Sequence, residues 1–125
     1  SFVAQLLRDA GARYALSGEM RQGNVELSLE ALYAMRGDVD ALGLVLYEPD
    51  TANLTLARWM ESNPHHAQIL PSSGQVFAAN AVTCDYFGWW VAHPDAMLRN
   101  LRHVLYGEGD GATGDQSPCF KWLAP

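Results

Sequence analysis

The fold depends on the stretch GDVDALGLVLYEPDTANLTLARWM, residues 37–60. Residues 41–47 (ALGLVLY) form a short aliphatic run, which is typical of a central β-strand buried on both faces. Residues 48–53 (EPDTAN) are turn formers, and residues 54–59 (LTLARW) alternate between apolar and polar side chains. We therefore expect 41–47 and 54–59 to pair as antiparallel strands; a helix over residues 51–62 is the alternative.

Two amphipathic helices are expected before this stretch. Helical spacing of apolar residues predicts a first helix over residues 2–17, weakened by Gly11, and a second over residues 25–36, between Asn24 as N-cap and Gly37 as stop. The first helix also carries apolar residues outside its main stripe, so we expect a homodimer through this helix: Phe2, Ala4, Ala12, Ala15 and Leu16.

The second half of the chain predicts further strands and one clear helix. Residues 75–84 and 86–93 are rich in Val, Phe, Tyr and Trp, which favours two strands. Pro94 begins a helix that Gly107 ends, and residues 120–123 form a closing strand. Together these helices and strands predict one α/β domain, more closely of the α+β type, over residues 1–125.

Composition excludes several functions. Eight basic against fourteen acidic residues give a net charge of −6 with no basic stripe, so we expect no nucleic-acid partner. No apolar run is long enough to cross a bilayer, so any membrane anchor is expected outside this chain. The sequence contains no nucleophile elbow, phosphate loop or zinc motif, so we expect a non-enzymatic domain without metal or cofactor.

Two cysteines, Cys84 and Cys119, are present. One disulfide between them would close a loop of about 35 residues and contribute roughly 3–4 kcal/mol. Two buried free thiols are equally compatible with the composition.

A resemblance extends over residues 6–59. The order of a long helix, a Gly/Asn break, a second helix and the segment GDVDALGLVLYEPD…LTLARW resembles the periplasmic input domains of bacterial membrane-bound sensor histidine kinases and diguanylate cyclases. The closing FKWLAP is similar to the last strand of those domains. This resemblance implies a PAS-like fold, in which long N-terminal helices pack on one side of a central antiparallel sheet.

The same resemblance also implies a cellular location and a role in signalling. The chain would be a periplasmic, signal-sensing input domain of an inner-membrane protein, dimeric through its first helix, with a small-molecule ligand. An oxidising compartment would then favour the Cys84–Cys119 disulfide.

A second resemblance is local. The stretch WMESNPHHAQIL, residues 59–70, is similar to the W-M-x-S-P-G-H-R-A-N-I-L motif of secreted CAP (cysteine-rich secretory protein-like) domains. It implies the alternative of a secreted CAP-like protein, in which Trp59 and Ser62 lie on a helix. A periplasmic binding or inhibitor protein is a further alternative.

Five residues are candidates for ligand binding. Arg58 is expected on the sheet, where its guanidinium could bind the carboxylate group of a ligand. The imidazoles of His65, His66 and His93 are candidate ligand-binding groups, and Trp89 offers a flat apolar wall.

Overall fold

The computed structural model describes residues 2–15, 28–109 and 116–125. Its elements, in chain order, are α1 (Phe2–Asp9), α2 (Leu29–Met35), β1 (Leu42–Leu46), the 3₁₀ turn η1 (Thr51–Asn53), α3 (Leu56–Ser62), α4 (His66–Ile69), β2 (Val76–Asn80), the π-helical turn η2 (Tyr86–Trp90), α5 (Pro94–Tyr106) and β3 (Phe120–Trp122). Helices and a small sheet together confirm the α+β class.

The sheet has three strands in the order β1-β2-β3. β1 pairs with β2 in parallel, with Leu44 opposite Ala78, and β2 pairs with β3 antiparallel, with Ala79 opposite Phe120. The sheet is therefore mixed, and the expected all-antiparallel sheet is wrong at the β1–β2 pair. Parallel strands need a long crossover, which here contains η1, α3 and α4.

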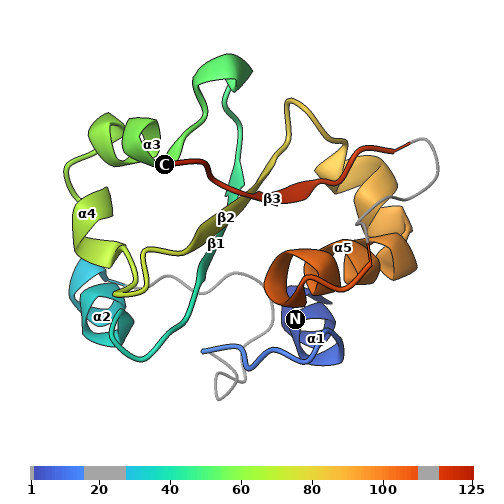
Figure 1. Cartoon of the computed structure of the whole chain (residues 1–125), viewed down its shortest axis with the longest axis horizontal. Helices are drawn as coiled ribbons and strands as arrows, with labels where there is room; N and C mark the ends of the chain where they lie inside the picture. Colours follow the sequence, from blue (N-terminus) through green and yellow to red (C-terminus); the bar gives the residue numbers. More distant parts are fainter. Residues whose placement is uncertain (1, 16–27, 110–115) are drawn as a thin grey trace.

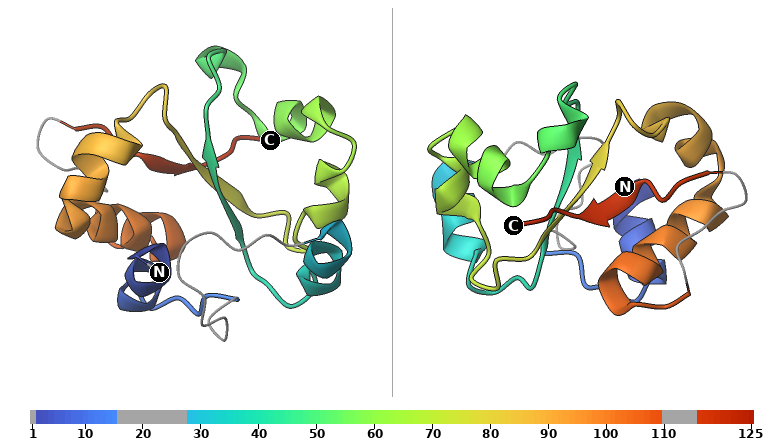
Figure 2. Two further views of the ribbon diagram at one scale, coloured as in Figure 1. Left: turned by 180° about the vertical axis from the view of Figure 1, so that it is seen from behind. Right: turned by 45° about the horizontal axis from the view of Figure 1, so that its top comes forward.

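The sheet lies between two groups of helices (Figure 1 and Figure 2). One group contains α1, η2 and α5, and the other contains α2, α3 and α4. The main core lies between the sheet and the first group: side chains of α1, β2, η2, α5 and β3 form one buried cluster. Phe77 and Ala79 of β2 belong to it, while Val76, Ala78 and Asn80 are buried outside that cluster, as strand alternation requires.

Helix α1 is shorter than predicted because Gly11 ends it. The N–H of Gly11 donates to the carbonyl oxygen of Arg8, and the N–H of Ala12 donates to that of Leu7, both at 2.9 Å. Gly11 has a φ of +94°, so these bonds form the Schellman motif that closes helices at a left-handed glycine. Of the predicted helix over residues 2–17, residues 2–9 are helical, and residues 16 and 17 lie outside the described residues.

Helix α2 begins later than predicted. Ser28 is its N-cap, and its side chain accepts from the N–H of Ala31 at 3.2 Å. Asn24, the expected cap, lies outside the described residues.

The predicted strand over residues 54–59 is wrong, because this segment enters helix α3. Thr55 is the N-cap, in extended conformation, and its Oγ1 accepts from the N–H of Arg58 at 3.1 Å. Trp59 is then the buried residue of the helix. A cap and one buried aromatic side chain outweigh the apolar alternation of Leu54 and Leu56.

The predicted strand over residues 86–93 is also wrong. Asp85 begins the helical turn η2, and its carboxylate accepts from the N–H of Trp89 at 3.0 Å. A Cβ on Gly88 would clash with that carboxylate, so a larger residue at this position would displace the side chain that caps the turn. Local side-chain-to-backbone bonding thus overrides the β propensity of the aromatic residues.

The remaining helix and strand predictions for the described residues hold. β1 and β3 lie within the expected ranges, and β2 covers part of residues 75–84. Helix α5 begins with Pro94 in its first turn and ends at Gly107, whose φ is +70°.

Candidate functional site

An open cleft of about 590 Å³ lies between the carboxyl end of β1 and helix α3. None of the described residues that line it belongs to the main buried cluster. Helices α3 and α4, which contribute to the cleft, lie on the other side of the sheet from α5 (Figure 1). Nine residues line it: Leu46, Tyr47, Glu48, Leu54, Arg58, Trp59, Glu61, Ser62 and His66. The size suits a small organic ligand.

Asn80 fixes the β1 wall of the cleft. Its buried side-chain amide accepts from the N–H of Glu48 at 3.0 Å and donates to the carbonyl oxygen of Glu48 at 2.9 Å. This pair of bonds extends the β1–β2 pairing beyond Leu46 and holds the backbone next to Tyr47. The wall is therefore pre-organised, which lowers the entropy lost when a ligand binds.

Trp59, Ser62 and His66 form a compact cluster on the α3–α4 side. The Trp59 and His66 rings stack with centroids 4.1 Å apart and planes 9° from parallel. The carbonyl oxygen of Trp59 accepts from Nδ1 of His66 at 2.6 Å and from Oγ of Ser62 at 2.7 Å. Both side chains are thus fixed by one backbone atom.

These bonds define what each group can offer a ligand. A carbonyl only accepts, so Nδ1 of His66 carries its proton and, in the neutral ring, Nε2 is the acceptor. Because Nδ1–H has no free lone pair, it cannot take the proton of Ser62, although the two atoms lie 3.4 Å apart. The pair is therefore no nucleophile–base dyad.

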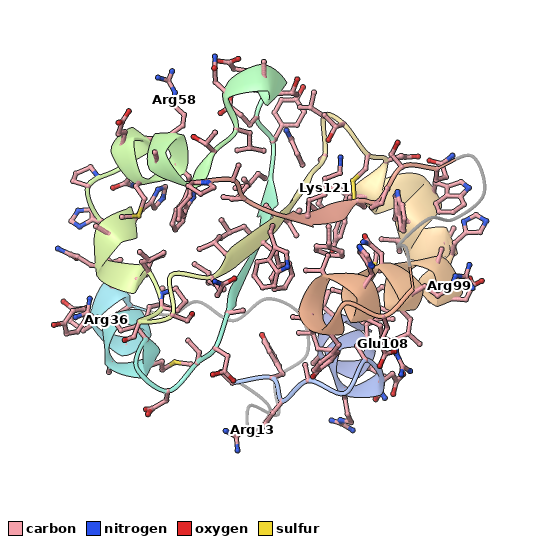
Figure 3. All side chains as sticks on the ribbon, viewed as in Figure 1. Arg13, Arg36, Arg58, Arg99, Glu108 and Lys121 are labelled. Carbon is pink, nitrogen blue, oxygen red and sulfur yellow. A yellow bond between two sulfur atoms is a disulfide. The ribbon has the colours of Figure 1, made fainter. Side chains whose placement is uncertain are left out.

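Arg58 stands at the rim of the cleft. Its side chain is exposed and extends outward from α3 (Figure 3). Within the described residues the ion pairs are Arg99 with Asp95, at 3.6 Å, and Arg102 with Glu108, at 2.6 Å. The guanidinium of Arg58 is in neither pair.

The five predicted ligand residues fall into two places. Arg58 and His66 both line the cleft, and His65 precedes His66 as the exposed N-cap of α4. Trp89 and His93 lie on the opposite side of the sheet, at η2 and the start of α5, and are not part of the cleft. Their rings stack at 4.0 Å, and Nδ1 of His93 donates to the carbonyl oxygen of Trp89 at 2.6 Å.

Sequence reasoning missed the wall residues Tyr47, Glu48 and Glu61 as site residues. Tyr47 and Glu48 become site residues only because the chain turns at the end of β1 and returns as α3. Trp59 and Ser62 had a signal, since both belong to the stretch that resembles CAP domains.

The disulfide between Cys84 and Cys119 is present and joins the segment after β2 to the start of β3. In the described ranges, no cluster of three or more His, Cys, Asp or Glu side chains is placed to hold a metal ion. None of the described helices is long and apolar enough to cross a membrane.

A scan against protein-family models, a search of curated proteins and a search of solved structures each found no match to this chain. The functional argument therefore depends on the cleft itself.

Proposed function

We propose that this chain is a non-enzymatic, extracytoplasmic ligand-binding domain and that its ligand occupies the cleft between β1 and α3. The observation that carries the proposal is the combination of groups on that cleft. A guanidinium with no ion pair among the described residues, a histidine acceptor of fixed tautomer and an exposed tyrosine share one opening, and hydrogen bonds hold its walls. A few fixed polar groups in a concave, partly apolar surface are typical of small-molecule sites.

The disulfide supports an extracytoplasmic location. Disulfides persist in secreted and periplasmic proteins and are rare in the cytosol. In this chain both cysteines are in the bond, as expected for a structural disulfide rather than a reactive pair of thiols.

Among extracytoplasmic classes, the geometry favours the secreted CAP-like alternative. Trp59 and Ser62 lie one turn apart on helix α3, as the local resemblance implies. The ring that packs on Trp59 is that of His66, whereas the histidine of the motif corresponds to His65. The strand pair on which the sensor resemblance depended is not formed, because residues 56–62 are helical.

The sensor input domain is the second candidate, and one observation favours it. Leu6 and Ala10 of the first helical segment are buried in the core, whereas Phe2 and Val3 are 46% and 40% exposed. These exposed apolar side chains at the start of the helix would pack against the same helix of another copy, as in the PAS-like, dimeric input domain of an inner-membrane kinase or cyclase.

Ligand binding is tested by NMR on the ¹⁵N-labelled protein with a small panel of probes: a monosaccharide, a dicarboxylate, an alkylamine and an aromatic acid. We expect at least one class to shift the amide signals of residues 46–48 and 58–66. The Arg58→Ala variant should change the affinity, and the matched Arg99→Ala variant, with an exposed arginine on α5, should not. If no probe moves the cleft signals at millimolar concentration, the proposed function is wrong.

The biological setting has a separate test, the full-length gene product. A cleaved signal peptide without membrane spans supports the CAP-like class, and spans on both sides of this domain followed by a kinase or cyclase support the sensor. In the sensor case sedimentation should detect a dimer that Val3→Glu abolishes.

A further inference from the structure

We infer that the cleft between β1 and α3 takes a neutral, polyhydroxylated ligand, a sugar unit, rather than the carboxylate that Arg58 alone suggests. The inference depends on the proposed function, since it names the chemical class of the ligand for that same cleft. Three features of the described residues carry it: the balance of donors and acceptors, the local charge and one exposed aromatic ring.

The cleft is rich in hydrogen-bond acceptors. Ser62 uses its only O–H on the carbonyl oxygen of Trp59, so its Oγ can only accept from a ligand. His66 uses Nδ1–H on the same carbonyl, so the neutral ring offers Nε2 as an acceptor. Glu48 and Glu61 add carboxylate oxygens, of which Oε1 of Glu48 already accepts from the N–H of Asp50 at 2.9 Å.

The donors are the several N–H groups of Arg58, which has no described ion pair, and the phenolic O–H of Tyr47. A ligand that fits must therefore donate to most of the lining groups and accept from the remaining two. Hydroxyl groups do both, whereas a carboxylate ligand has no proton to donate.

The charge of the lining argues against an anionic ligand. The two carboxylates of Glu48 and Glu61 outnumber the single guanidinium of Arg58. A dicarboxylate would approach a site with an excess of negative charge, on a chain whose net charge is −6. A neutral ligand is not repelled.

Tyr47 supplies the apolar contact. It is 77% exposed, although its neighbour Glu48 is held firmly by the side chain of Asn80. The ring is thus a flat surface on a fixed backbone, open to solvent and next to polar groups. The C–H face of a sugar ring packs on such a surface while its hydroxyls reach the acceptors on α3.

The test is an NMR titration of the ¹⁵N-labelled chain with N-acetylglucosamine and methyl glucoside, beside succinate and butylamine. We expect the sugars to shift signals of residues 46–48 and 58–66 with a dissociation constant of about 1–10 mM, which is ordinary for a small neutral ligand in an open site. Succinate should leave these signals unchanged.

Three variants test the result further. Tyr47→Ala should weaken sugar binding about fivefold through loss of the stacking surface, and the matched Phe87→Ala, which removes an aromatic ring 74% exposed at η2, should leave it unchanged. Glu61→Gln keeps one acceptor oxygen and removes a charge, so sugar affinity should change less than about twofold.

The outcomes separate the two proposals. Succinate or butylamine binding in the cleft without the sugars overturns the ligand class and leaves the proposed function standing. Sugar shifts confined to other surfaces, or equal binding by Tyr47→Ala and the native chain, also overturn the class. If these four probes and the aromatic acid all leave the signals of residues 46–48 and 58–66 unchanged at millimolar concentration, both proposals are wrong.

Discussion

The edge strand β3 depends on one side chain, that of Asn100. Asn100 lies on α5 and is fully buried. Its Nδ2 donates to the carbonyl oxygen of Phe120 at 3.0 Å, and its Oδ1 accepts from the N–H of Phe120 at 2.7 Å. The carboxamide therefore acts as a neighbouring strand would, and satisfies the outward backbone groups of a buried edge position.

Replacing Asn100 with leucine, which has the same branched arrangement of heavy atoms, removes both partners and leaves two backbone groups of Phe120 buried without hydrogen bonds. Each unpaired group costs about 1–3 kcal/mol, so the two cost about 2–6 kcal/mol. Burial of the leucine side chain offsets up to about 2 kcal/mol of this. We expect a net loss of about 2–4 kcal/mol in the free energy of unfolding.

Urea unfolding followed by tryptophan fluorescence measures this loss. With an m-value of about 1.5 kcal/mol per M, the midpoint of the Asn100→Leu variant should fall by about 1.5–2.5 M. Asn53→Leu is the matched control, because Asn53 is exposed and its side chain bonds only to the nearby carboxylate of Asp50. Its midpoint should change by less than about 0.5 M.

A third variant, Asn100→Asp, separates hydrogen bonding from packing. An ionised carboxylate there still accepts from the N–H of Phe120 but repels its carbonyl oxygen, whereas the protonated acid donates to that oxygen as the amide does. The stability deficit should therefore shrink as pH falls from 7 to 4. A loss below about 1 kcal/mol for Asn100→Leu, or a pH-independent deficit for Asn100→Asp, would refute the reasoning.

Three further perturbations have defined outcomes. Reduction of the disulfide, whose cysteines are separated by 35 positions, should lower the free energy of unfolding by about 4 kcal/mol in the loop-entropy model, measured by urea unfolding with and without reductant. Gly43→Ala should cost about 1–3 kcal/mol, because its Cβ would lie 2.5 Å from the ring of the buried Phe77, whereas Gly37→Ala, with no atom within 4 Å, should be near neutral by the same assay. Burial raises the pKa of Tyr86 above its usual 10, so the unfolded chain releases that proton at lower pH than the folded chain does. The resulting stability is retained below about pH 10 and lost as pH rises further. Thermal melts between about pH 9 and 11 should therefore show a smaller loss of stability with rising pH for Tyr86→Phe than for Tyr47→Phe.

The elements that the sequence predicts correctly are those whose signals are complete within a few residues. Helix α5 has proline in its first turn, a regular apolar face and a glycine after its last residue. Its local sequence signals and its tertiary contacts therefore favour the same helix. β1 is a short aliphatic run between turn formers, and the same description holds in the structure.

The errors come from segments whose local patterns conflict. Residues 54–59 alternate as a strand does, but Thr55 is also a helix N-cap, and only the parallel pairing of β1 with β2 makes a helical crossover necessary. At η2 the aromatic residues favour a strand, but the hydrogen bond from the N–H of Trp89 to the carboxylate of Asp85 stabilises a helical turn instead.

The candidate site could be predicted only in part, for the same reason. Arg58 and His66 were identifiable as chemically capable residues, but the expectation that Arg58 projects from a sheet is wrong. Trp89 and His93 have the same stacked Trp–His contact as Trp59 and His66 but lie on the other side of the sheet. Local chemistry is visible in the sequence; which side of the sheet a segment covers is a property of the topology.

The division of the molecule by its sheet has a consequence for function. The disulfide, Asn100 and the main buried cluster all stabilise the side formed by α1, η2 and α5. The cleft lies on the other side, on helices of seven and four residues held by a cap and by bonds to the carbonyl oxygen of Trp59. Short helices with few buried contacts open at low free-energy cost, which suits a binding surface that adjusts to its ligand. Asn80 joins the two regions: its side chain holds the cleft wall at Glu48, while the adjacent Ala79 packs in the main core. The rigid side thus supports one wall of the cleft directly, and the other wall can move without loosening the core.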